Sequence, residues 1–355
     1  MAFKYTKMKI FHYIDKLNSL PLSNKSILPP IHIRIKPTNF CNHSCSYCAY
    51  RNNNLQLGLN MEERDFIPKM RLNEIIEDLI EMRVKAVTFS GGGEPFCYPF
   101  LTQAIELLAK SQIKFASLTN GSLVIGKNAE LFAKYGSWLR VSIDGWDEES
   151  YSKFRSVPFG EFSKVMKNME HFKKLNGDCH LGVSIIVGKE NAEHIFDLSM
   201  KLKKIGVDSI KISPRIISNS GVENNIYHEP IFEKVKSQIS LLKKECSSDF
   251  EVYDSFHLQL ETFEKNYTWC PYHQILAVIG ADLNIYPCQD KAYNLETGLI
   301  GTIKNKRFKD FWFSDKNNFF KINPSLVCNH HCVANEKNKM IIEYLDADKE
   351  HLEFV

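Results

Sequence analysis

The feature that most constrains the fold is a regular alternation of short apolar segments with longer amphipathic ones. The apolar segments read as β-strands, and the patterns between them have the period of helices. This alternation predicts parallel strands joined by right-handed helical crossovers. The expected strands are 31–36, 85–90, 114–119, 138–143, 180–187 and 208–213, and the expected helices lie near 71–82, 99–111, 127–135, 160–175 and 191–205.

Six strand–helix units predict an α/β protein built as a partial (βα)6 barrel, which is a TIM-like barrel left open on one side. Residues 1–30 are expected to form a helix-containing lead-in, and residues 31–250 the barrel, with a further helix near 229–245. After this point strands become short and cysteines return. Residues 251–355 are therefore expected to form a small cysteine-rich domain with a C-terminal helix.

The composition is that of a soluble globular protein, with 44% hydrophobic and 25% charged residues. A net charge of +3 gives no argument for a nucleic-acid partner. No apolar run reaches the roughly 18 residues that span a bilayer, and the N-terminus lacks the apolar core of a secretion signal. The ten cysteines fall in groups, which favours metal ligands in a reducing cytoplasm over disulfides. We expect a cytoplasmic protein without a nucleic-acid or membrane partner.

Three closely spaced cysteines, Cys41, Cys45 and Cys48, follow the first expected strand. Three thiolates on one loop can bind three irons of a cubic iron–sulfur cluster and leave the fourth iron open to another ligand. A structural zinc site usually needs four ligands, and a disulfide is disfavoured within so short a loop. Loops after strands are also where α/β folds place active sites. The spacing therefore predicts an iron–sulfur cluster at the barrel mouth.

This spacing, with Tyr47 just before the third cysteine, resembles the signature of the radical S-adenosyl-L-methionine (SAM) enzymes. The resemblance implies a [4Fe–4S] cluster whose open iron is chelated by SAM. It also implies cleavage of SAM to a 5′-deoxyadenosyl radical, which removes a hydrogen atom from the substrate. The expected partner is an electron donor of the flavodoxin or ferredoxin type. The partial barrel is the fold that the resemblance implies as well.

The resemblance also assigns SAM-binding residues to the ends of the expected strands. The run Gly91, Gly92, Gly93 and Glu94 resembles a motif whose backbone contacts the SAM amino group, although three glycines alone would also suit a tight turn. The other expected contacts are Asn120, Ser142, Asp144, Arg155 for the SAM carboxylate, and Ser184 with Ile185 beside ribose and adenine. The competing interpretation makes Asp144 a helix cap and Arg155 a surface residue.

Three further residues are candidates for contact with the substrate. Lys211 and Arg215 end the sixth expected strand and could hold an anionic or polyhydroxylated molecule. Cys97 follows the glycine run and could donate a hydrogen atom to a substrate radical. Free cysteines are more often small buried hydrophobes, which is the alternative for Cys97 as for Cys179 and Cys246.

Four more cysteines, Cys270, Cys288, Cys328 and Cys332, lie in the C-terminal region. Four thiolates are the usual complement of a fully ligated [4Fe–4S] cluster. Segment 274–288 predicts a β-hairpin that brings the first two of them together.

This region resembles the short auxiliary-cluster module called twitch, which is related to the longer SPASM domain, and the resemblance implies a second [4Fe–4S] cluster. It departs from that pattern in having Leu283 where a glycine is expected, and in the spacing of the last two cysteines. The alternative is a zinc site, with His273, His330 and His331 nearby.

The whole pattern resembles radical SAM enzymes that act on carbohydrates, aminoglycosides or nucleotide sugars. We therefore expect oxidation (dehydrogenation) or epimerisation of a small polar substrate, which makes the protein an oxidoreductase or epimerase. A rival hypothesis is epimerisation or crosslinking of a ribosomally made peptide, although only 40 residues precede Cys41, too few for an independent leader-binding domain. A third hypothesis is an activator of a glycyl radical enzyme, and a fourth is a non-catalytic iron–sulfur or zinc module.

Overall fold

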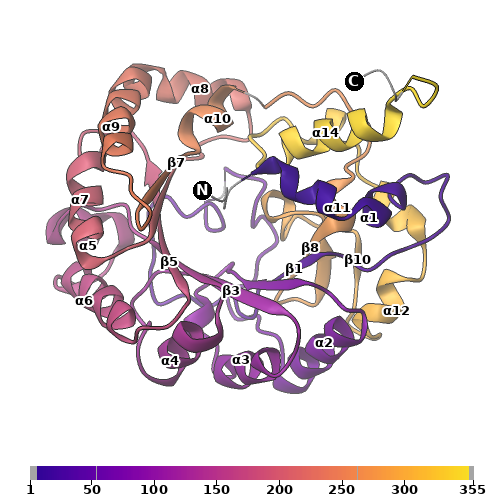
Figure 1. Ribbon diagram of the computed structural model, residues 1–355, viewed down its shortest axis with the longest axis horizontal. Coiled ribbons are helices and arrows are strands. Elements are labelled where there is room, and N and C mark those ends of the chain that lie inside the picture. The colour runs from indigo at the N-terminus through magenta and orange to yellow at the C-terminus, as the bar shows by residue number, and fades with distance from the viewer. Residues whose placement is uncertain (1–5, 53, 262, 352–355) are drawn as a thin grey trace.

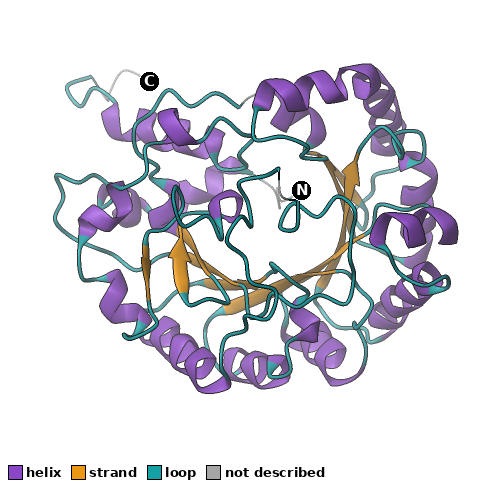
Figure 2. Ribbon diagram, turned by 180° about the vertical axis from the view of Figure 1, so that it is seen from behind, coloured by secondary structure: helices purple, strands orange, loops and turns teal. Residues whose placement is uncertain are grey.

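The computed structural model describes residues 6–52, 54–261 and 263–351. One curved sheet runs through these residues in the strand order β10-β9-β8-β1-β2-β3-β4-β5-β6-β7. Helices cover its convex side, and loops and residues 7–12 lie within its curve (Figure 1, Figure 2). The strands are β1 (His32–Ile35), β2 (Ala86–Phe89), β3 (Lys114–Thr119), β4 (Trp138–Ser142), β5 (His180–Val187), β6 (Ser209–Pro214), β7 (Glu251–Asp254), β8 (Leu276–Ile279), β9 (Asn284–Tyr286) and β10 (Gly301–Thr302).

The helices of the barrel follow its strands in turn. They are α2 (Lys69–Glu81), α3 (Leu101–Ala109), α4 (Gly126–Tyr135), α5 (Glu148–Arg155), α6 (Glu161–Lys174), α7 (Ile195–Ile205), α8 (Gly221–His228) and α9 (Phe232–Lys244). The lead-in contains the 3-10 helix η1 (Lys7–His12) and α1 (Ile14–Asn18). The C-terminal region contains α10 (Phe256–Glu261), α11 (Tyr272–Ile275), α12 (Phe308–Trp312), α13 (Pro324–Val327) and α14 (Asn335–Asp346). Short 3-10 turns are η2 (Pro95–Cys97), η3 (Glu229–Ile231), η4 (Gln289–Lys291) and η5 (Lys316–Phe320).

The six expected strands are confirmed as β1 to β6, and they pair in parallel in sequence order. Alternating burial along β1 and β4 divides their side chains between the core under the helices and the interior of the barrel. Ile33 and Ile35 of β1 are fully buried in the core that lies under the helices, whereas His32 and Arg34 point into the barrel. The α/β barrel fold predicted from the repeated strand–helix pattern is thus the fold observed.

The sheet extends beyond the six expected strands at both edges. Strand β7 pairs in parallel with β6, and β8 pairs in parallel with β1. The expected hairpin is confirmed, because β8 and β9 are antiparallel around the turn at Gly280. The cysteine-rich region therefore continues the barrel sheet through β8. A domain boundary near 250 remains a prediction.

Buried polar contacts fasten the C-terminal region to the barrel. Asp78 of α2 is fully buried and accepts from Arg307 Nη2 at 2.7 Å and from the backbone N–H of Phe308 at 2.9 Å. It thereby satisfies amide groups at the start of α12 that the helix itself cannot pair. Among the described residues, no helix is long and apolar enough to cross a membrane.

Candidate functional site

A cavity of about 280 Å³ opens at the carboxyl ends of the barrel strands. Cys41, Cys45 and Cys48 all line it. The strand ends contribute residues 90–95 after β2, 118–120 on β3, Ser142 on β4, Ile186 on β5 and 214–216 after β6. The expected loop cysteines and strand-end residues therefore surround one space, where α/β barrels place their chemistry.

The cysteine loop is fixed to the end of α5 by its backbone. The N–H groups of Ser44 and Ser46 donate to the carbonyls of Arg155 and Phe154, at 3.1 and 3.0 Å. The three thiols are partly accessible, and burial raises the pKa of Cys41 to about 12 and also raises the pKa of Cys45. Both are therefore neutral thiols at neutral pH, and binding of iron has to displace their protons.

The glycine run forms one wall of the cavity because no larger residue fits there. A Cβ on Gly92 would lie 2.5 Å from Asn39 Oδ1 and 2.5 Å from Met61 Sδ. A Cβ on Gly93 would overlap the backbone of Phe40. The run is thus a tight turn and a cavity wall at once, and its contact with the SAM amino group remains a prediction.

Glu94 completes this wall and is almost fully buried. Its carboxylate accepts from Thr119 Oγ1 and from the backbone N–H of Asn120, both at 2.6 Å, and from the N–H of Phe96 at 3.0 Å. Burial raises the pKa of Glu94, and these three hydrogen bonds oppose the rise. Glu94 thereby ties the glycine turn to the end of β3.

Asp144 and Arg155 form a buried ion pair behind the cavity wall. Arg155 Nη2 lies 2.5 Å from Asp144 Oδ2, and Tyr47 donates its hydroxyl proton to the same carboxylate. Arg155 is 4% exposed, so it is not a surface residue, and the helix that follows is capped by Asp147 rather than Asp144. Arg155 and Tyr47 line the cavity, whereas Asp144 does not. Asp144 therefore orients the two residues that do.

Only some of the remaining expected SAM contacts line the cavity. Asn120 and Ser142 line the cavity, and Asn120 Nδ2 also donates to Asn42 Oδ1 at 2.8 Å. Ser184 is not among the lining residues. The placement of Ile185 beside a ligand is wrong, because its side chain is buried in the core beneath the helices. Its neighbour Ile186 lines the cavity instead, as a period of two along β5 dictates.

The three substrate candidates also lie apart. Arg215 lines the cavity and pairs with Glu190 at 3.3 Å. Lys211 lines a separate cavity, together with Asp254 at the carboxyl end of β7 and Cys332. Cys97 lines neither, and its thiol lies 3.5 Å from Asn42 Oδ1.

Lys36 is a residue at this site that the sequence analysis missed. It is fully buried, and its Nζ lies 2.5 Å from Tyr50 Oη and 2.9 Å from the carbonyl oxygen of Gly91. Burial lowers the pKa of Lys36, while Asp290, Cys288 and Cys48 raise it. Lys36 thus lies between the two cysteine groups. The position of this lysine, directly after the first buried strand, was the sequence signal that could have placed it at the site.

The four C-terminal cysteines come together from three segments, because Cys328 and Cys332 share the loop between α13 and α14. They precede α11, follow β9, follow α13 and precede α14, and each of them is partly accessible. Burial is the main reason that the pKa of Cys288 is raised, and the nearby charges of Cys332, Cys328 and Cys270 raise it further. Asn338 of α14 donates to Cys270 Sγ at 3.1 Å. Among the described residues, no three His, Cys, Asp or Glu side chains already surround a single metal ion.

Two buried lysines provide positive charge beside these cysteines. Lys291 donates to Gln56 Oε1 at 2.7 Å and to the carbonyl of Val327 at 2.5 Å, and Lys265 donates to the carbonyl of His330. Burial lowers the pKa of each lysine, and Cys328 is among the groups that raise it. Such cations suit a site whose ligands become thiolates.

Two of the three histidines considered as zinc ligands form hydrogen bonds to other groups. His330 bonds to Gln56 Nε2 at 2.7 Å, and His273 bonds to the carbonyl of Phe319. Both ring nitrogens of His331 are buried without a partner. At the other departure from the twitch pattern, Leu283 has a φ of 60°, which is the left-handed conformation that favours glycine.

Comparison with known proteins finds a family match over part of this chain. Residues 35–202 match the family described as the Radical SAM superfamily. The chain is 26% identical over 181 residues to the antilisterial bacteriocin subtilosin biosynthesis protein AlbA of Bacillus subtilis, a match covering 50% of this chain and 38% of that protein. It is 20% identical over 307 residues to a tungsten-containing aldehyde ferredoxin oxidoreductase cofactor-modifying protein of Pyrococcus furiosus, covering 82% and 83%. The first curated relatives are matched over only 36 to 43% of their length.

Solved structures share the fold over most of the chain. Streptococcus suis SuiB bound to its precursor peptide SuiA superposes with a TM-score of 0.63 at 17% identity, covering 88% of this chain and 71% of that one. The protein named anSMEcpe, with bound AdoMet, superposes with a TM-score of 0.58 at 18% identity, covering 89% and 96%. The likeness extends beyond the residues of the family match.

Proposed function

Because residues 35–202 of this chain belong to the Radical SAM superfamily, we propose that the cavity binds SAM beside a [4Fe–4S] cluster. In this proposal the enzyme removes a hydrogen atom from a small polar, carbohydrate-like substrate. One observation carries the proposal: Cys41, Cys45 and Cys48 share a single cavity with Gly91–Gly93 and Glu94. When bound, the cluster supplies the electron that cleaves SAM to the 5′-deoxyadenosyl radical. A flavodoxin or ferredoxin type of donor is part of the proposal.

The cavity fits such a ligand set on grounds of its own. Three free thiols without a disulfide partner face it, which leaves one iron of a cubane without a protein ligand. Ser90 Oγ lines it, buried and without a hydrogen-bond partner. An unpaired hydroxyl of this kind is costly unless a polar ligand satisfies it.

The residues around the cavity have separable roles in the proposal. The three cysteines would hold the cluster, and the glycine backbone with Glu94 would position the amino group of SAM. Arg155 is held by Asp144 at 2.5 Å, so its remaining donors have a fixed direction towards the cavity and could receive the SAM carboxylate. Ser142 and Arg215 would orient a polar substrate.

The second cysteine group makes oxidation possible in this proposal. Loss of a hydrogen atom leaves a substrate radical, and oxidation requires one more electron to leave it. Cys270, Cys288, Cys328 and Cys332 would hold a second iron–sulfur cluster as the acceptor, with Lys265 and Lys291 compensating the thiolate charge. Epimerisation would require a hydrogen atom from the opposite face instead.

Modification of a peptide is the second candidate, because the relatives point to it. AlbA is named for biosynthesis of a bacteriocin, and SuiB shares the fold and was solved with a precursor peptide. Polar side chains at the barrel mouth suit a peptide backbone as well as a sugar. The two candidates predict different substrates and the same cleavage of SAM.

The deciding experiment is anaerobic reconstitution with iron and sulfide, followed by metal analysis and an assay for 5′-deoxyadenosine from SAM and dithionite. We expect about eight irons per chain and formation of 5′-deoxyadenosine. About four irons with one zinc would retain the radical chemistry but remove the proposed electron acceptor. Absence of 5′-deoxyadenosine from a fully loaded protein would overturn the proposal.

The substrate class is then separated by isotope transfer. Deuterated sugars, aminocyclitols and nucleotide sugars are compared with deuterated peptides, and deuterium is measured in 5′-deoxyadenosine. Transfer from a carbohydrate supports the first candidate, whereas transfer from a peptide alone replaces it with the second.

A further inference from the structure

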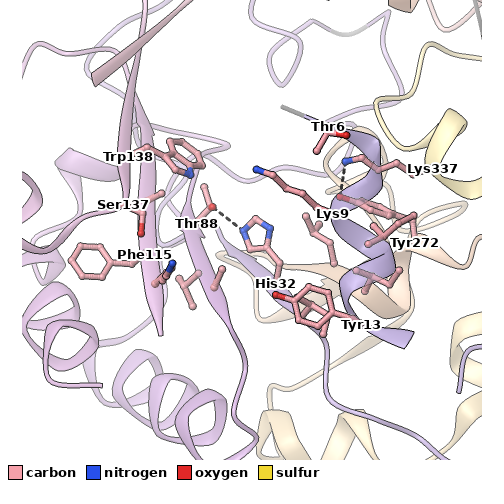
Figure 3. Close-up of a pocket in the computed structure, with 18 of the residues that line it drawn as sticks. Thr6, Lys9, Tyr13, His32, Thr88, Phe115, Ser137, Trp138, Tyr272 and Lys337 are labelled. Atoms are coloured by element: carbon pink, nitrogen blue, oxygen red, sulfur yellow. Dashed lines mark hydrogen bonds between the residues drawn. The ribbon is translucent and has the colours of Figure 1, made fainter. Parts of the chain in front are cut away.

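A second cavity lies at the opposite mouth of the barrel, where the strands begin (Figure 3). Its volume is about 400 Å³, and its walls are the first residues of β1 to β4, the helix η1 and Lys337 of α14. It shares no lining residue with the cavity of the cysteine loop. A ligand here would therefore bind separately from SAM.

The charged residues that line this cavity are all lysines. Lys7, Lys9, Lys114 and Lys337 line it, and no carboxylate does so among the described residues. Outside the lining, Glu336 lies 3.6 Å from Lys7 Nζ, and Lys339 also contacts that carboxylate at 3.4 Å. The cavity therefore has a surplus of positive charge.

Two of these lysines reach into the cavity from η1 and α14. Lys9 extends from η1 across the cavity towards Trp138, while Lys337 reaches the same space and donates to Tyr272 Oη at 3.1 Å (Figure 3). Burial lowers the pKa of Lys9, and the charge of Lys337 lowers it further. Burial likewise lowers the pKa of His32 to about 3, with Arg34 and Lys337 adding to the effect. Like charges held together in this way favour an anionic ligand.

An adjoining cavity strengthens the positive potential. It has a volume of about 330 Å³ and shares Thr6, Lys7 and Lys337 with the first. It is also lined by Lys211 of β6 and by Cys332 of the C-terminal cysteine group. Burial lowers the pKa of Lys211 to about 8, and Lys337 is among the cations that lower it further, whereas Asp290 opposes them. The acids that line this second space are Asp254, which bonds to His257 at 2.6 Å, and Glu336.

The kind of cation and the apolar wall define the ligand. Lysines bind phosphate as point charges, and several lysines around one space suit a doubly charged phosphate better than a singly charged carboxylate. Phe115 and Trp138 line the other side of the cavity, and the hydroxyls of Thr6 and Ser137 border it. The cavity thus offers charge at one side and an aromatic surface at the other.

We propose that this cavity binds a small organic phosphate, with its phosphate group between Lys9 and Lys337 and its apolar body against Trp138. Binding requires neither SAM nor the cysteine loop, so the inference goes beyond the proposed function and does not depend on it.

The test is titration calorimetry of the anaerobically reconstituted full-length protein with phenyl phosphate, inorganic phosphate and phenol. We expect one saturable site for phenyl phosphate, weaker binding of inorganic phosphate, and weakening at high salt. Lys337→Gln should weaken phenyl phosphate about tenfold because one charge-assisted contact is lost. Lys110→Gln, a change at an exposed lysine that does not line the cavity, should have no effect.

Two further variants separate the possible outcomes. Trp138→Leu should weaken the binding of phenyl phosphate more than that of inorganic phosphate. Lys9→Gln should weaken the binding of phenyl phosphate about as much as Lys337→Gln is expected to, and it tests the site independently if Lys337→Gln does not fold. Cys45→Ala should bind phenyl phosphate as the wild type does, although it should lose SAM cleavage. The proposal would be overturned if phenyl phosphate did not bind saturably, or if phenol bound as tightly as phenyl phosphate. It would also be overturned if Lys110→Gln weakened binding as much as Lys337→Gln, or if Cys45→Ala lost the binding of phenyl phosphate.

Discussion

The two cysteine groups of this chain are built in opposite ways. Cys41, Cys45 and Cys48 belong to one loop, and that loop is open to a cavity. The C-terminal group draws its cysteines from three segments that are distant in the sequence, and buried Lys265 and Lys291 lie beside it. The first group is thus encoded locally in the sequence, whereas the second is brought together only by the folded C-terminal region.

The largest expected effect comes from the local group. Cys45→Ala removes one of three thiolates that have no substitute nearby, so 5′-deoxyadenosine formation should fall to background and iron should drop from about eight to about four per chain. The measurement is SAM cleavage with dithionite after reconstitution. Cys246→Ala, at an exposed cysteine outside both groups, is the matched control. Cleavage retained by Cys45→Ala would refute the cluster assignment.

The second prediction tests whether the two groups are independent. Cys288→Ala should lose about four irons and all substrate oxidation, yet SAM cleavage without substrate should remain within about twofold of wild type. The reason is that the first loop is held by α5 rather than by the C-terminal region. Iron content and 5′-deoxyadenosine are measured on one sample. If cleavage disappears as well, the two sites are coupled and the local group is not self-sufficient.

A third, smaller effect concerns charge around the C-terminal group. Lys291→Met removes a buried cation beside Cys328, so iron at this group should be lost to a chelator several-fold faster while the first group is unaffected. Lys316→Met is a matched control, because Lys316 is also buried and donates to backbone carbonyls, including that of Ser26 at 3.0 Å. Equal acceleration in both variants would show a general loss of packing and no specific charge effect.

The smallest expected effect lies in the open cavity. Glu94→Gln keeps the shape of the side chain but turns one acceptor into a donor that faces N–H groups, so SAM affinity should fall about threefold with iron content unchanged. Equilibrium dialysis of SAM against the reconstituted protein measures this. Glu130→Gln on the exposed face of α4 should match the wild type. An unchanged affinity in Glu94→Gln would remove Glu94 from the SAM site.

Local patterns predicted the barrel because they depend on neighbours in the chain. Each of the six expected strands was found within a residue or two, since alternation reports which side chains face the core. The same periodicity would have placed Ile186 rather than Ile185 at the cavity. Leu283 illustrates the limit of a motif, because the chain adopts the backbone conformation of the missing glycine all the same.

The parallel barrel, the three-cysteine loop and the glycine wall could all be predicted from the sequence, because each is encoded by residues close together in the chain. Tertiary contacts were needed to establish that β8 joins β1, that Asp144 supports Arg155 rather than lining the cavity, that Lys36 lies between the cysteine groups, and that lysines gather at the far mouth. These features depend on contacts between distant segments, which form only when burial of the whole core holds those segments together.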